Sequence, residues 1–331
     1  MRKPFVGLVI LACVPFFVLA GAAQQGSPAP TAAPAAVASI LSQEFHLAGP
    51  HSQDTQYFLM ESRLINFAAD GTRAGTDVFR LRLKCVPAAI SGKGGDEYTC
   101  VRFTVQQGDG LEKAIPALEN WTHLFTGAGY DEKGQVFGID HAKFDSLTYS
   151  DGSAISSDKA YHVYNAFIDF HGFCNMFPDS SAEGKGIQDL KRIGQTIVHS
   201  AAFSQPPVNL GENVAEGSFF KNGEITLTFK GLSLVNGKPC ALVGYDSGES
   251  SFKMIMKPAP TLEILTTGSS HYSGDIYKDL LSNWVQRVTM TEMVVSETKL
   301  PMPPNKVDSV IERVIEIRNV SQNEFVSGGV R

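Results

Sequence analysis

The chain contains 331 residues, of which 43% are apolar and 19% are charged, so it can form one large domain or two ordinary ones. The formal net charge of −6 argues against binding to nucleic acid, which needs clustered lysine and arginine side chains. A mean hydropathy of −0.05 with a single long apolar run excludes a protein with several membrane spans. An aromatic content of 10% excludes wholesale disorder.

The N-terminus has the parts of a secretory signal peptide. Arg2 and Lys3 precede an apolar run over residues 5–20, and small residues follow it as a cleavage site of the A-x-A kind. The run is shorter than the roughly 20 residues that a membrane span prefers, although a retained anchor helix is the alternative. We therefore expect a signal peptide over 1–23, cleavage near Ala23, and a secreted or periplasmic protein without a transmembrane span.

The remainder of the chain divides by composition and pattern. Residues 24–40 are rich in alanine and proline and have little to bury, which is typical of an extended linker. A β-rich segment over 41–150, a helical insert over 151–205 and a second β-rich segment over 206–331 follow. The two β-rich segments are expected to form either two domains or one.

The cysteines that survive cleavage are even in number, which in an exported chain suggests disulfides. They are Cys85, Cys100, Cys174 and Cys240. Cys85 and Cys100 flank a candidate hairpin, so we favour a bond between them and a second bond between the other two. Apolar alternation points Cys85 and Cys100 to opposite faces of the sheet, unless a β-bulge near residue 86 or 99 restores the parity. Unpaired structural cysteines are the alternative, and no C-x-x-C pair supports a zinc site.

The first β-rich segment begins with two strands. Residues 56–67 are rich in β-formers, and residues 79–86 alternate apolar side chains with outward basic ones. A glycine-rich loop joins them to a third strand over 98–105. Apolar residues one turn apart predict a helix over 111–125, and 130–138 reads as a hairpin.

The central segment predicts helices. From Ser157 the apolar residues recur at helical spacing, and His162, Asn165 and Asp169 lie on the other side as an exposed polar face. A second, weaker helix is predicted over 187–201.

The last segment is strongly β. The phase of its apolar alternation slips at Gly231, which is typical of a β-bulge, and Asn236-Gly237 predicts a tight hairpin that pairs Leu232 with Ala241. Further strands are expected over 252–256, 261–267, 274–281, 285–297 and 307–319. The predicted fold is mainly β, an antiparallel curved sheet, barrel or sandwich, with a central helical insert.

No motif assigns chemistry. The segments 244–248 and 268–272 do not fit the G-x-S-x-G spacing of a nucleophile elbow. The carboxylates that a glycosidase pair could use near turns are Asp246, Glu249, Asp275 and Asp279, and nothing selects two of them. We therefore assign no catalytic residue, no metal ligand and no cofactor.

The prediction of function rests on the composition and the predicted fold class alone. The 21 phenylalanines, 9 tyrosines and 8 methionines will mostly form core, but a curved sheet can also leave an apolar cavity with a helix as its lid. In strand order and signal peptide the chain resembles periplasmic lipid-carrier lipoproteins and other open-barrel envelope proteins, without a motif that transfers any residue. We expect an exported non-catalytic protein that binds a hydrophobic small molecule or lipid, or an envelope protein. The alternatives are an exported hydrolase using paired carboxylates and a structural envelope component.

Overall fold

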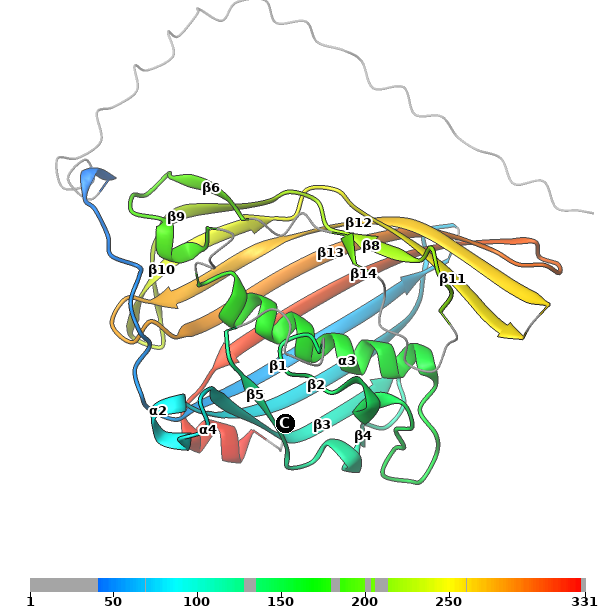
Figure 1. The fold of residues 1–331 in the computed structure, drawn as a ribbon, viewed down its shortest axis with the longest axis horizontal. Helices are drawn as coiled ribbons and strands as arrows, with labels where there is room; N and C mark the ends of the chain where they lie inside the picture. Colours follow the sequence, from blue (N-terminus) through cyan, green and yellow to red (C-terminus); the bar gives the residue numbers. More distant parts are fainter. Residues whose placement is uncertain are drawn as a thin grey trace, which may run out of the picture. The chain divides into compact units, whose positions relative to one another are not determined.

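The structure is a computed structural model (Figure 1). It describes residues 41–68, 70–127, 135–179, 185–199, 204–205, 214–259 and 261–328. The expected signal peptide and linker, residues 1–40, lie outside the described residues, as does the turn of the hairpin expected over 130–138.

One antiparallel sheet of 14 strands forms the body of the described chain. The strands are β1 (Gln56–Phe67), β2 (Arg73–Val86), β3 (Asp96–Gln107), β4 (Lys113–Ala114), β5 (Trp121–Phe125), β6 (Thr196–His199), β7 (Ser204–Gln205), β8 (Phe219–Lys221), β9 (Ile225–Val235), β10 (Lys238–Asp246), β11 (Ser250–Ala259), β12 (Leu262–Asp279), β13 (Val285–Lys299) and β14 (Lys306–Asn319).

The strand order shows an open sheet. It runs β4-β3-β2-β1-β14-β13-β12-β10-β9-β6, with β5 beside β3 and with β11, β8 and β7 continuing from β12. The sheet is curved and not closed, so the mainly antiparallel prediction is confirmed in its curved-sheet form. Ser62 of β1 pairs with Ile315 of β14, so strands from both predicted β-rich segments belong to the same sheet.

Helix α3 (Ser157–His171) crosses the inner face of this sheet and continues as the π-helical turn η3 (Gly172–Met176) (Figure 1). Its apolar side packs aromatic rings on the strands: Phe170 lies 5.0 Å from Phe58, and Phe167 lies 5.9 Å from Phe103, centroid to centroid. Burying each such ring stabilises the fold by about 2–3 kcal/mol. The predicted amphipathic helix is confirmed.

The helix predicted over 111–125 is wrong. The segment forms β4, the 3-10 turn η1 (Pro116–Leu118) and β5 instead. Pro116 lacks the amide that a continuous helix needs, and Asn120 has a φ of 59°, which breaks helical geometry. Pairing of β5 with the free edge of β3 then satisfies the backbone, so tertiary contacts override the helical spacing.

The second helix, predicted over 187–201, is also wrong where it is described. The chain forms the 3-10 turn η4 (Ile187–Asp189) and then β6, which pairs with β9. Gly194 has a φ of 86° between them, which a helix does not accommodate.

The C-terminal strands follow the sequence pattern closely. The register of β9 with β10 shifts opposite Gly231, and Leu232 pairs with Ala241, as predicted. Asn236 and Gly237 have φ values of 52° and 78°, as a tight type I′ hairpin requires. The strands expected over 261–267 and 274–281 form one continuous strand, β12.

Three shorter helices complete the described chain: α2 (Ala88–Ser91), the 3-10 turn η2 (His141–Phe144) and α4 (Gln322–Ser327). The sequence pattern did not predict α4. Its N-terminus is capped by Ser321, whose hydroxyl accepts from the Glu324 amide at 3.2 Å. Within the described ranges, no helix has both the length and the apolar character needed to span a membrane.

Candidate functional site

A buried ion cluster joins α3 to the inner face of β13 and β14. Arg313 Nε donates to Glu292 Oε2 at 2.6 Å, and Arg313 Nη1 donates to Asp169 of α3. The planar guanidinium suits this geometry because its fork of N–H groups can serve two carboxylates at once. The cluster therefore fixes the helix to the sheet through charges within a largely apolar layer. We call these three residues the ion cluster.

The polar side of α3 was expected to face solvent, and this expectation is wrong. Lys159 forms an ion pair with Asp77 of β2, and the ring of His162 lies 5.7 Å from that of Phe79. Asp169 lies on the same side of the helix, in the ion cluster. Because the sheet curves around the helix, both sides of α3 contact strands, which sequence periodicity cannot show.

Burial sets the electrostatics of this contact. It raises the pKa of Asp169 to about 6, although the charge of Arg313 opposes the shift. Burial also lowers the pKa of His162 to about 4, against the opposing effect of Asp158. For Arg313 the two carboxylates outweigh burial and raise the pKa, so the guanidinium stays charged.

The inner face continues past the ion cluster with apolar side chains among small polar ones, since Ser270 pairs with Val294 and Ser296 pairs with Ser309 on the same face. Val294 and Ile311 lie two residues beyond the cluster on β13 and β14 and pair directly across the two strands, on the same face. Phe252 of β11 covers Gly268 of β12, where an added Cβ would meet the phenyl ring at 2.5 Å. We call Val294, Ile311 and Phe252 the distal inner surface, and all three side chains are only partly buried.

Element lengths explain why α3 does not cover the distal inner surface. β12 has 18 residues and spans about 60 Å at a rise of roughly 3.3 Å per residue. α3 has 15 residues and a length of about 22 Å. Figure 1 shows β11 and β12 running on beyond the helix. The apolar side chains of the distal inner surface are therefore left partly accessible between the serines of the same face.

A second polar network lies between β3, β5 and the end of α3. His123 Nε2 and His171 Nε2 are 2.7 Å apart, His171 Nδ1 is 3.0 Å from Asn175 Oδ1, and Asn175 Nδ2 donates to the Tyr98 hydroxyl at 3.1 Å. Because an amide oxygen only accepts, His171 donates from Nδ1, and His123 must donate from Nε2 to the lone pair of His171. His123 Nδ1 is then an acceptor without a partner among the described residues.

The two imidazoles are neutral and enclosed. Burial lowers the pKa of His171 to about 4 and that of His123 well below its ordinary value, with His171 adding to the second shift. Phe125 stacks on His171 at 5.1 Å and Trp121 on His123 at 5.0 Å, centroid to centroid. A pair shielded in this way holds β5 against α3 and is badly placed to exchange protons with a dissolved substrate.

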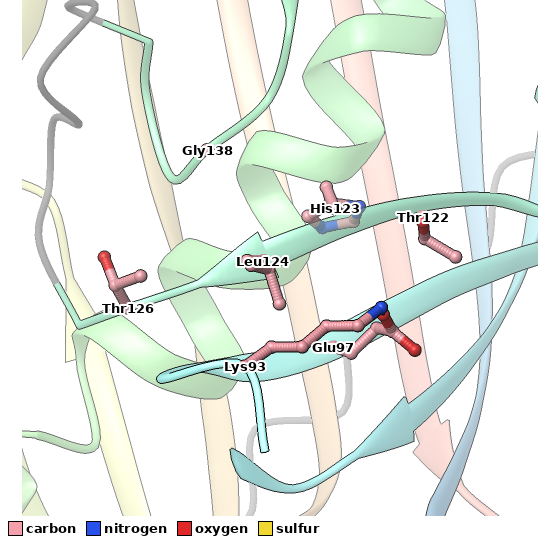
Figure 2. Close-up of a pocket in the computed structure, with 7 residues that line it drawn as sticks. All are labelled: Lys93, Glu97, Thr122, His123, Leu124, Thr126 and Gly138. Carbon is pink, nitrogen blue, oxygen red and sulfur yellow. The ribbon is translucent and has the colours of Figure 1, made fainter. Parts of the chain in front are cut away.

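A pocket of about 450 Å³ opens beside this network (Figure 2). Lys93 and Glu97, two of its lining residues, form an ion pair. Figure 2 shows the His123 ring pointing toward α3, whereas Leu124 points to the opposite side of β5. His123 is also one of the lining residues, but its ring lies on the other side of β5 from the Lys93–Glu97 ion pair.

The four candidate disulfide cysteines, Cys85, Cys100, Cys174 and Cys240, are buried and free in the structure. A bulge is present, as parity required: Arg82 pairs with Arg102 and Leu83 with Cys100, so Val101 is the extra residue, close to the predicted position 99. It brings Cys85 and Cys100 to the same face, where Cys85 pairs with Tyr98. The two cysteines are therefore diagonal neighbours, at a Cα separation of about 7–8 Å, which exceeds the reach of a disulfide.

We therefore expect free thiols. Burial raises the pKa of the Cys85, Cys100 and Cys174 thiols, and it raises that of Cys240 to about 11, so all four react slowly in the folded state. Alkylation in denaturant without reductant, followed by peptide mapping, should label all four. A peptide pair linked through Cys85 and Cys100 would contradict the register observed here.

Most of the carboxylates singled out for a hydrolase have structural partners. These partners are His271 and the Gly248 amide for Asp246, Lys230 for Asp275, and Ser282 and the Leu281 amide for Asp279. Glu249 precedes β11. Within the described chain these contacts stabilise turns and strand pairs, and none of them joins two of the four carboxylates.

The described ranges contain no group of three or more histidine, cysteine, aspartate or glutamate side chains that could hold a metal ion. His271 and Asp275 lie on one strand, β12, and pair with Asp246 and Lys230, so their side chains do not converge.

Comparison with known proteins adds little. No family model matches the sequence, and no curated protein matches it. Among solved structures, the high-pH structure of OprB from Pseudomonas putida shares 9% identity, covers 81% of this chain and 94% of its own, and has a TM-score of 0.17. Similarity at that TM-score supports no argument about fold or function.

Proposed function

We propose that this protein is an exported, non-catalytic binding protein that holds a hydrophobic ligand on the distal inner surface. The observation that carries the proposal is a contrast along one face of the sheet. Ile315 and Val288 are fully buried in the core, whereas farther along the same strands Ile311 packs against the margin of the core and Val294 is partly exposed. Apolar area left in water costs about 25 cal/mol per Å², which a hydrophobic ligand would recover.

The neighbouring elements support this use of the surface. The ion cluster lies at the border between the filled core and the distal inner surface, so it holds α3 in place beside the ligand. Export itself rests on the N-terminal sequence pattern.

The first test is native mass spectrometry of protein purified from the exported fraction, before and after organic extraction. We expect an excess mass that disappears on extraction, with a lipid in the extract. A clean apo mass in the unextracted protein contradicts the proposal.

Two substitutions at successive residues of β13, whose side chains point to opposite faces of the sheet, test the site. Val294→Asp places a carboxylate on the distal inner surface, and Val295→Asp places one on the outer face, where Val295 is 50% exposed. We expect Val294→Asp to weaken binding of the neutral probe N-phenyl-1-naphthylamine by about tenfold or more, because a charge facing an apolar ligand loses hydration. Val295→Asp should bind the probe like the parent. Equal affinity in both variants would place the ligand elsewhere.

An envelope partner is the second candidate, and a different observation favours it. Val295 and Met293 are 50% and 43% exposed on the outer face of β13, and Val295 pairs with Val310 of β14. An exposed apolar strip of this kind suits a protein partner. In that case Val295→Asp, and not Val294→Asp, would abolish co-purification of the partner from the envelope fraction.

A further inference from the structure

A second pocket, of about 530 Å³, lies at the opposite end of the sheet from the distal inner surface. It forms where β1 begins and β14 ends, beside the β9–β10 and β12–β13 turns. The volume falls within the range of about 300–1,000 Å³ that is typical of small-molecule sites. The pocket shares no residue with the distal inner surface.

Buried amides distinguish this pocket. Gln56, Gln286 and Asn319 line it, with exposures of 8%, 1% and 5%. Each amide carries both a donor and an acceptor group, and burying such groups is costly unless they find partners. The three side-chain amides therefore form one hydrogen-bonding side of the pocket, which we call the wall.

Several donor and acceptor groups of these three amides already have hydrogen-bond partners within the protein. Asn319 Nδ2 donates to Gln56 Oε1 at 2.9 Å and to the Val285 carbonyl at 3.3 Å, and Lys238 Nζ donates to Gln286 Oε1 at 3.1 Å. These bonds fix the orientation of the amides. Gln56 Nε2 also donates to the Asp54 carbonyl at 2.7 Å and Gln286 Nε2 to the Trp284 carbonyl at 3.5 Å, so Asn319 Oδ1 is the amide oxygen that has no hydrogen bond from the described residues.

The charges at the pocket balance. Lys238 has no carboxylate within ion-pair distance in the described chain, and it shares the pocket with Asp54. Glu324, the remaining acidic residue, is neutralised by Arg318 at 2.7 Å. The pocket therefore has no excess of one sign that would select a charged ligand.

We propose that this pocket binds a neutral carbohydrate. Adjacent sugar hydroxyls both donate and accept hydrogen bonds, which matches side-chain amides that also do both. The hydroxyl groups of Thr55, Ser282 and Ser321 also line the pocket; Ser282 donates to Asp279 and Ser321 accepts from the Glu324 amide, and each hydroxyl retains further hydrogen-bonding capacity. A purely apolar ligand would leave the remaining hydrogen-bonding capacity of these groups unsatisfied, at a cost in desolvation.

The test uses the full chain, with D-galactose and N-acetyl-D-glucosamine as separate probes in saturation-transfer NMR at millimolar concentration. Gln286→Met replaces a buried amide by an apolar side chain of similar shape, and Lys238→Met removes an exposed ammonium. Lys257→Met on β11 is the matched control, because Lys257 lies outside the pocket. Thermal melting confirms that each variant is folded.

We expect transfer to at least one sugar in the parent and in Lys257→Met. Gln286→Met and Lys238→Met should weaken that binding by about tenfold, the effect of losing one hydrogen bond. If Gln286→Met does not fold, Lys238→Met decides alone. The proposal is overturned if neither sugar receives saturation from the parent protein, or if the pocket variants bind as tightly as Lys257→Met.

Discussion

Lowering the pH from 7 to about 4.5 is expected to remove several kcal/mol of folding stability. His162 and His171 have folded-state pKa values of about 4, against an ordinary value of 6.5, and that of His123 also lies well below 6.5. Below 6.5 the unfolded chain binds protons that the folded chain excludes. The stabilisation is therefore complete above pH 6.5 and is lost as the pH falls toward 4, by roughly 3 kcal/mol for His162 and for His171.

Asp169 acts in the opposite direction. Burial raises its folded-state pKa from 3.8 to about 6, so the folded chain binds this proton first as the pH falls. As the pH falls from 6 to 4, protonation of Asp169 stabilises the folded state and offsets roughly 3 kcal/mol of the loss caused by the histidines. The imidazoles still outweigh it, because more than one of them contributes.

Urea unfolding at a series of pH values measures this effect. The variant His171→Gln removes one buried imidazole, so the loss of stability between pH 7 and 4.5 should shrink by roughly 2.5 kcal/mol. His271→Gln is the matched control, since His271 has a side-chain exposure of 52%. The explanation fails if the parent is equally stable at both pH values, or if the two variants lose the same stability.

Breaking the ion cluster should also have a large effect. Arg313→Met leaves Asp169 and Glu292 buried without their cation, which we expect to cost about 3–5 kcal/mol at pH 7. Arg287→Met is the matched control: Arg287 pairs with Glu316 at 2.9 Å across the same two strands, with both side chains exposed. An exposed pair contributes about 0–1 kcal/mol. Urea unfolding of both variants measures the difference.

A combined variant separates charge from packing. Asp169→Leu with Glu292→Leu and Arg313→Met removes the entire cluster, and its stability should return close to that of the parent protein. A combined variant as unstable as Arg313→Met would show that the cost comes from packing. If Arg313→Met alone is no less stable than Arg287→Met, the ion cluster is not needed to hold α3.

One residue of the ion cluster could be recognised from the sequence pattern. Arg313 occupies the same alternation as Ile311, Ile315 and Ile317, so it had to point toward the core and needed a buried partner. The identity of that partner could not be predicted. Asp169 is 144 positions away along the chain, and its place on α3 suggested an exposed carboxylate.

The two wrong helices show a related limit. Segments 111–125 and 187–201 carry apolar residues at helical spacing, but each lies beside a free sheet edge in the folded chain. Unpaired backbone groups at an edge favour the addition of a strand. A local sequence pattern cannot predict a sheet edge, because residues distant in the chain create that edge.

Elements with a local cause can be predicted from the order of residues alone. Alternating apolar residues set the long strands, Asn236-Gly237 set a hairpin, and helical periodicity set α3. Tertiary structure alone decided that β1 pairs with β14, that the polar side of α3 is buried, and that three amides meet at one pocket. These features depend on how a wide sheet curves around a short helix, and no sequence period records that curvature.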